Sequence, residues 1–114
     1  MQVDLGAFQK QAAEAAGMLK TLSNESRLLV LCHLVAEGEL TVGDLNERVG
    51  LSQSALSQHL AKLREEGLVA TRKEAQAVHY RICDPRAHQI LGVLHEVFCP
   101  DLGEQKPQSN GDTQ

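Results

Sequence analysis

Residues 52–66 carry short hydrogen-bonding side chains on one face of what reads as a helix. Three leucines at helical spacing indicate its buried face, and Ser52 and Gly67 are suited to begin and end it. Glutamine can make a two-point pair with adenine, serine can bond to base edges, and lysine or arginine can hold phosphate. The candidate side chains, with the histidine at the edge of the face, are Gln53, Ser54, Ser57, Gln58, His59, Lys62 and Arg64. This face predicts a helix that lies in a DNA groove; an ordinary amphipathic helix with a solvated face is the alternative.

The cysteines are the other side chains with reactive chemistry. Three of them, Cys32, Cys83 and Cys99, are an odd number in a chain that we expect to be cytoplasmic, which argues against a structural disulfide framework. Cys32 falls in an apolar helical stripe, where a cysteine is commonly a small buried hydrophobe. An enzyme with Cys99 as nucleophile and His95 as base would lack an oxyanion device and a third orienting group, so we expect no enzymatic activity.

The elements around residues 52–66 complete a DNA-binding motif. Residues 41–50 predict a short helix with Thr41 as its cap, and a glycine turn follows. After Gly67, the β-rich runs 68–74 and 78–82 predict a hairpin with a turn over 75–77. Helix, turn, helix and hairpin together predict a winged helix-turn-helix, a mainly α fold with a β-hairpin wing. The wing residues expected to reach flanking phosphate or the minor groove are Arg72, Lys73, Gln76 and Arg81.

Composition predicts one small helical domain over residues 1–100. Of 114 residues, 42% are hydrophobic and only 3% aromatic, enough for one core built from aliphatic side chains. The polar tail 101–114 is expected to be disordered. We find no apolar run near the roughly 20 residues of a membrane span and no signal peptide, so we expect a cytoplasmic protein without a membrane partner.

The charge distribution predicts weak binding to random DNA. The chain has a net charge of -4, yet residues 41–82 hold six basic and five acidic side chains and are close to neutral. Tight binding should therefore depend on base contacts and on two copies binding together.

Apolar stripes at both ends of the chain are candidates for a dimer interface. One lies on a first helix and the other on a last helix that begins near Asp84 and Pro85. The predicted interface residues are Leu5, Phe8, Ala12, Leu19, Ile90, Leu91, Leu94 and Phe98. The alternative is that both stripes cover the core of a monomer, but a chain this small offers few other elements for them to cover.

These segments carry a family resemblance that covers roughly residues 5–100. The sequence resembles the ArsR/SmtB family of dimeric winged-helix regulators in residues 19–28, 39–45, 52–63 and 67–69. It is most similar to the HlyU/BigR/SqrR thiol-sensing branch in residues 52–60, 71–76 and 94–99. The resemblance implies five helices with a hairpin between the fourth and fifth. It also implies dimerisation through the first and fifth helices and reading of a pseudo-palindromic operator by the fourth.

Metal sensing is the founding activity of that family, but the ligand positions are altered here. Thr41 and Gly43 occupy the places of one family cysteine pair, and neither binds a soft metal. At the second family site Asp84 is present, but Arg86 stands where a histidine should be. The remaining His88, His95 and Cys99 could hold zinc only by recruiting ligands across a dimer. We therefore predict neither a metal site nor another cofactor.

The resemblance further implies a reactive thiol pair at Cys32 and Cys99, with Cys83 outside the pattern. Oxidation or persulfidation of the pair would switch DNA binding by forming a disulfide or a longer sulfur bridge. The predicted function is a sequence-specific transcriptional regulator that binds double-stranded operator DNA as a homodimer. A reactive sulfur species or another oxidant would be its inducer. A metal-responsive repressor and a constitutive regulator without an inducer are the alternatives.

Overall fold

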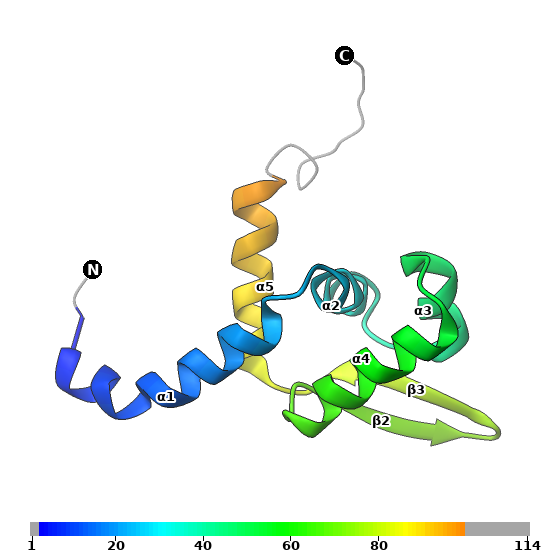
Figure 1. Cartoon of the computed structure of the whole chain (residues 1–114), viewed down its shortest axis with the longest axis horizontal. Coiled ribbons are helices and arrows are strands. Elements are labelled where there is room, and N and C mark those ends of the chain that lie inside the picture. Colours follow the sequence, from blue (N-terminus) through cyan, green and yellow to red (C-terminus); the bar gives the residue numbers. More distant parts are fainter. Residues whose placement is uncertain (1–2, 100–114) are drawn as a thin grey trace, which may run out of the picture.

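In the computed structural model of the protein, residues 3–99 are described, so the polar tail predicted over 101–114 lies outside the described residues. Figure 1 shows a mainly helical fold with a β-hairpin between α4 and α5, which confirms the predicted winged helix-turn-helix. The elements in chain order are α1 (Leu5–Leu22), α2 (Glu25–Glu37), β1 (Leu40–Thr41), α3 (Val42–Val49), α4 (Gln53–Glu65), β2 (Val69–Glu74), β3 (Ala77–Ile82) and α5 (Pro85–Phe98).

Local capping fixes the two helices of the helix-turn-helix. At α3, Thr41 and Asp44 form a capping box in which each side chain accepts a hydrogen bond from the other's backbone N–H, both at 3.1 Å. Gly50 ends α3 in the left-handed conformation, with φ at 68°, where a side chain would be strained. At α4, the Ala55 N–H donates to Ser52 Oγ at 3.1 Å. The predicted caps at Thr41 and Ser52 are therefore confirmed.

The sheet has one strand more than the sequence predicts. The additional strand is β1, in which Leu40–Thr41 pairs with β3 and gives the order β1-β3-β2. Both strand pairs are antiparallel. Two residues are too few for an alternating pattern, so no sequence signal marked this strand. The turn predicted over 75–77 is one residue too long, since Ala77 pairs with Glu74 as the first residue of β3. In the resulting two-residue turn Ala75 has a positive φ of 56°, as tight hairpin turns require.

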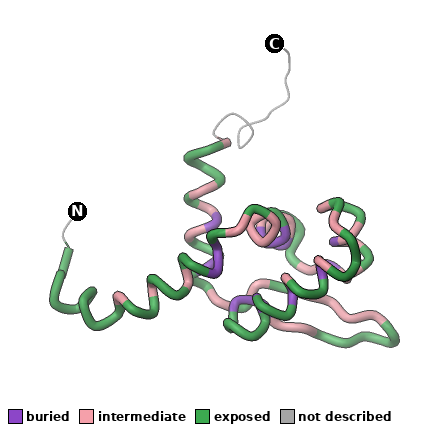
Figure 2. The backbone as a smooth tube through the Cα atoms, in the orientation of Figure 1, coloured by how far each residue is buried: buried purple, intermediate pink, exposed green. Residues whose placement is uncertain are grey.

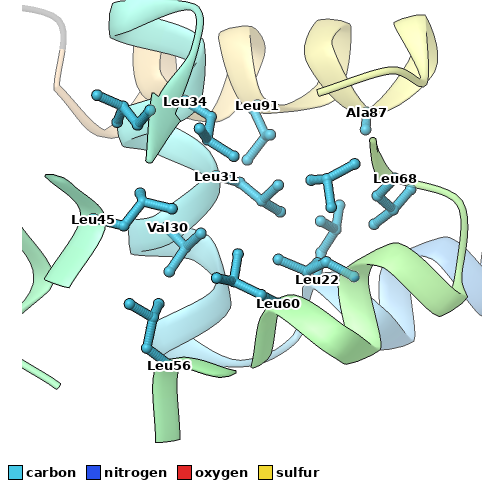
Figure 3. Close-up of a cluster of buried hydrophobic side chains, with 13 residues drawn as sticks. Leu22, Val30, Leu31, Leu34, Leu45, Leu56, Leu60, Leu68, Ala87 and Leu91 are labelled. Carbon is cyan, nitrogen blue, oxygen red and sulfur yellow. The ribbon is translucent and has the colours of Figure 1, made fainter. Parts of the chain in front are cut away.

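Aliphatic side chains from most elements meet in one core, shown in Figure 3. The central α2 contributes Val30, Leu31 and Leu34, and α4 contributes its three leucines. The complete buried hydrophobic set is Leu22, Val30, Leu31, Leu34, Leu40, Leu45, Leu56, Leu60, Leu63, Leu68, Val69, Ala87 and Leu91. This core orients α4 and the sheet, so the polar side of α4 is left outside.

The prediction that Leu91 lies at a dimer interface is wrong. Leu91 is 1% exposed within the single chain and belongs to the core cluster with Leu31 and Leu34 of α2 (Figure 3). The apolar side chains of α5 occupy more than one side of the helix, so spacing alone did not separate the inner side from the outer one. The exposed side instead presents Val93, which was not predicted, together with Val97 and Phe98.

Most of α1 lies apart from the core. Only Thr21 and Leu22, at its C-terminal end, are buried. Figure 2 shows the rest of this helix as exposed or half-buried. One ion pair joins it to the start of α5, because Arg86 Nη1 lies 3.0 Å from Glu14 Oε2. Within residues 3–99, no helix combines the length and apolar character needed to cross a membrane.

Candidate nucleic-acid interface and thiol pair

The predicted reading face of α4 is exposed along its length. Leu56, Leu60 and Leu63 face the core, whereas the opposite side presents polar groups to solvent. The exposed members of the predicted set are Gln53, Ser54, Ser57, Gln58, Lys62 and Arg64, and His59 is half-buried at the edge of the face. Lys62 Nζ is 3.3 Å from Glu66 Oε2 at the end of the helix, an exposed pair that contributes little to stability.

The wing places its predicted side chains in different surroundings. Lys73, Gln76 and Arg81 are exposed. Arg72 is also exposed, but its guanidinium is ion-paired with Glu39 at 2.8 Å and with Glu74 at 3.0 Å. Glu39 precedes Arg72 by 33 residues and reaches it only because β1 joins the sheet. The sequence carried no local signal of this pair.

A pocket lies where the wing meets α4. It measures about 410 Å³ and is lined by Tyr80 of β3 together with Ser57, Leu60 and Arg64 of α4. Tyr80 also packs against the core from its half-buried position. Tyr80 therefore lies where the reading face of α4 meets the wing.

Cys32 and Cys99 come from two helices that pack together, α2 and the end of α5. Cys32 is half-buried on the wall of a pocket of about 200 Å³ between these helices, beside Leu91, Gly92 and His95. Burial raises the pKa of the Cys32 thiol, and the negative charge of a Cys99 thiolate raises it further. The second effect requires the two thiols to be close enough for their charges to interact.

Cys83 differs from the other two cysteines in position and contacts. It follows β3, is exposed, and its Sγ donates to the Gly67 carbonyl at 3.4 Å. Among residues 3–99 no disulfide joins it to Cys32 or Cys99, since all three thiols are free.

Asp84 and Arg86, at the second of the family's metal positions, interact with each other. Asp84 caps α5 by accepting from the Arg86 N–H at 2.9 Å, and its carboxylate also pairs with the Arg86 guanidinium at 3.0 Å. The arginine lowers the Asp84 pKa, mainly through this side-chain hydrogen bond. Within residues 3–99 no group of three or more His, Cys, Asp or Glu side chains is arranged to hold a metal ion.

The two apolar stripes are exposed on α1 and α5. On α1 the large side chains of Leu5, Phe8 and Leu19 face solvent, and on α5 Phe98 does so. Ala12, Ile90 and Leu94 are half-buried. Between the two helices lies a groove of about 530 Å³ whose lining includes Phe8, Met18, Leu19 and Ile90.

The helix-turn-helix of α3 and α4, followed by the β2–β3 hairpin, is the arrangement of a winged helix-turn-helix DNA-binding regulator. Residues 24–71 match the family described as bacterial regulatory protein, arsR family. The transcriptional activator HlyU of Vibrio cholerae is 47% identical over 97 residues, which cover 85% of this chain and 89% of that protein. The biofilm growth-associated repressor of Xylella fastidiosa is 44% identical over 92 residues, covering 81% of this chain and 80% of that one. The chain belongs to the ArsR family of transcriptional regulators, which are DNA-binding proteins and not enzymes.

Solved structures agree with the fold. Reduced HlyU from Vibrio cholerae superposes with a TM-score of 0.76 at 48% identity, covering 82% of this chain and 97% of that chain. The transcriptional repressor BigR from Xylella fastidiosa gives a TM-score of 0.80 at 41% identity, covering 85% of this chain and 98% of that one.

Proposed function

We propose that the protein is a sequence-specific regulator whose affinity for operator DNA is switched by the Cys32–Cys99 thiol pair. The observation that carries this proposal is the packing of α2 on α5, which brings together the two helices that bear Cys32 and Cys99. In keeping with this packing, burial and then the charge of Cys99 raise the Cys32 pKa. A link between these sulfur atoms would join the central core helix to the end of α5. Such a link can bias the position of α4, which packs on the same α2.

Base reading is assigned to the exposed N-terminal half of α4. Gln53, Ser54, Ser57 and Gln58 have the donors and acceptors that base edges require, and the buried leucines fix the direction in which they point. Lys62 and Arg64 on α4, with Lys73 and Arg81 on the wing, are assigned to phosphate. His59 flanks the reading face, and Gln76, exposed at the hairpin turn, is assigned to the minor groove.

Binding as a homodimer is supported by the apolar surface of α1 and α5. Large hydrophobic side chains exposed on one chain favour burial against a second copy. The contact residues proposed on α1 are Leu5, Phe8, Ala12 and Leu19, and those on α5 are Ile90, Val93, Leu94, Val97 and Phe98. Two α4 helices related by a two-fold axis would then bind the two halves of a pseudo-palindromic operator.

A persulfide, RSSH, can serve as the oxidant that links the two thiols. One protein thiolate attacks the outer sulfur of RSSH, which forms a protein persulfide and releases RS⁻. The second thiolate attacks the inner sulfur of that persulfide, which closes a disulfide and releases HS⁻. If both cysteines carry a persulfide, attack of one on the inner sulfur of the other gives a trisulfide and HS⁻, and this longer bridge spans a greater separation.

The test is DNA binding by reduced, persulfide-treated and peroxide-treated protein, with a duplex that the protein itself selects from a random pool. We expect persulfide to weaken binding about 5- to 150-fold, which corresponds to a coupling of about 1 to 3 kcal/mol, and dithiothreitol to restore it. Cys32→Ser and Cys99→Ser should each abolish the response, and Cys83→Ser is the matched control that should respond like the parent. Treated parent protein should contain linked Cys32 and Cys99 peptides by mass spectrometry.

Three results would contradict the thiol switch. A parental response in the Cys32→Ser, Cys99→Ser double variant would show that other groups sense the oxidant. Release by zinc alone, reversed by a chelator, would identify a metal-responsive repressor. Unchanged binding under every treatment would identify a constitutive regulator.

A further inference from the structure

The outer face of the wing sheet carries a compact group of charges around Arg72. In the strand register His79 lies opposite Arg72 on one side and opposite Thr41 on the other. Because side chains alternate along a strand, Glu39 and Glu74, two positions from Thr41 and Arg72, fall on this same face. The sheet therefore brings two carboxylates to one guanidinium.

All three guanidinium nitrogens of Arg72 are engaged. Nε lies 3.3 and 3.2 Å from the two carboxylate oxygens of Glu39, and Nη2 lies 2.8 Å from Glu39 Oε1. Nη1 lies 3.0 Å from Glu74 Oε1 on the other side. Glu39 thus occupies the two-point edge that a DNA phosphate would use. Hydrogen bonds to Arg72 lower the Glu39 pKa, so this carboxylate is charged at neutral pH.

The local charge is unfavourable for phosphate. Arg72 and its two paired carboxylates sum to a charge of -1, with Arg81 acting on Glu39 from the same face of the sheet, and a phosphate that displaced Glu39 would lie beside both carboxylates. Lys73 is the adjacent residue, on the opposite face of the strand, and no ion pair within residues 3–99 involves it. Arg72 is therefore paired with two carboxylates, whereas the neighbouring Lys73 has no ion-pair partner among residues 3–99.

We infer that Glu39 and Glu74 mask Arg72 from the DNA backbone and thereby limit the affinity of the wing for random DNA. Arg72 is then a positioning residue that ties β2 to the segment before β1, and the neighbouring Lys73 makes a phosphate contact in its place. This inference rests on the proposed docking of the wing against DNA. It replaces the prediction that Arg72 itself holds phosphate.

The test is the salt dependence of binding to a random-sequence duplex, measured by fluorescence anisotropy between about 50 and 200 mM salt. Each phosphate contact contributes about 0.9 to the slope of log affinity against log salt. We expect Lys73→Ala to flatten the slope by about 0.9 and Arg72→Ala to leave it unchanged. The Glu39→Gln, Glu74→Gln double variant should steepen the slope by about 0.9, because Arg72 becomes available.

The same double change in an Arg72→Ala background is the matched control. Gln at positions 39 and 74 removes negative charge near DNA in either background, but only the parental background has an arginine to release. If the slope steepens equally with Arg72 absent, or if Arg72→Ala alone flattens it as Lys73→Ala does, masking is wrong. If neither Lys73→Ala nor Arg81→Ala has an effect, the wing does not dock on DNA, and the inference fails together with that part of the proposed function; if Lys73→Ala alone has none, the assignment of phosphate to Lys73 is wrong. If the parent protein does not prefer the selected duplex over random DNA, base reading by α4 is overturned. The inference about Arg72 is tested separately, because it depends only on the slopes measured with random DNA.

Discussion

Cys32 is predicted to react more slowly than Cys83 at neutral pH. Burial raises the Cys32 pKa, so a smaller fraction of this thiol is the nucleophilic thiolate, whereas Cys83 is exposed. Labelling of Cys32 by iodoacetamide should therefore continue to accelerate above pH 9, as followed by peptide mass spectrometry. Cys99→Ser should speed the reaction, because removal of the neighbouring charge lowers the Cys32 pKa. Equal rates for Cys32 and Cys83 at every pH would contradict the assignment.

Gln58→Ala is predicted to weaken binding to the selected duplex by about 1 to 3 kcal/mol, the range for a lost two-point base contact. Gln58 is exposed on the side of α4 opposite the buried leucines, so its replacement should leave the fold intact. Binding to random DNA should hardly change. Lys62→Ala is the control, since loss of a phosphate contact should weaken both duplexes alike. An equal loss on the two duplexes in Gln58→Ala would refute base reading at this position.

Individual side chains were predictable where a local rule decides their position. Helical spacing correctly separated the exposed Gln58 from the buried Leu60, because the period of a helix fixes which residues share a face. The pairing of Arg72 with Glu39 was not predictable, since a strand of two residues brings them together. Sequence spacing likewise gave no measure of the approach of Cys32 to Cys99, which the packing of α2 on α5 determines.

At the scale of the element, the capping box of α3 is predicted to make part of the protein's stability dependent on pH. Hydrogen bonds from Thr41 lower the Asp44 pKa in the folded chain. The carboxylate therefore stabilises the fold above the ordinary aspartate pKa, and this contribution is lost as the pH falls through the lowered value. In urea unfolding, the difference between the parent and Asp44→Asn should shrink from pH 7 to pH 3. A constant difference would show that Asp44 acts without its charge.

Thr41→Ala tests the other half of the same box. The Thr41 hydroxyl accepts the Asp44 N–H at 3.1 Å, and loss of such a cap costs about 0.5 to 2 kcal/mol of the free energy of unfolding. Thr41→Ser keeps the acceptor and should retain most of the stability. Equal destabilisation by both substitutions would point to packing of the threonine methyl group instead.

The helices were predicted well because their ends carry chemical signals. Ser52 and Thr41 each cap a helix as expected, α5 begins near Asp84 and Pro85 as expected, and Gly50 supplies the turn conformation that other residues adopt with strain. The two sides of α5 were not separated, because its apolar residues lie all around the helix and only tertiary packing buries Leu91 while it exposes Val93.

At the scale of the whole molecule, Val97→Glu is predicted to produce a folded monomer. Val97 is 63% exposed in one chain, so the charge should cost the fold little, but it would be buried without a partner in the proposed dimer. Sedimentation should report a single chain, and binding to the selected duplex should fall much more than binding to random DNA. A dimer that persists in this variant would exclude Val97 from the interface.

Leu91→Ala provides the contrast for the same experiment. Leu91 is buried in the core of one chain, so this change should lower the free energy of unfolding by about 2 to 5 kcal/mol. A monomeric Leu91→Ala protein of unchanged stability would show that the interface, and not the core, holds this leucine.

Tyr80 has a spectroscopic consequence for the intact protein. It is the single tyrosine of a chain without tryptophan, so the intrinsic fluorescence of the protein originates from this one phenol. Tyr80 lines the pocket between β3 and α4 together with Ser57 and Arg64. Emission intensity and quenching by iodide therefore sample the junction of wing and helix without any label. Titration with DNA can be followed at that junction, and a change in emission on oxidation of the thiols would reveal that the distant sulfur chemistry is felt there.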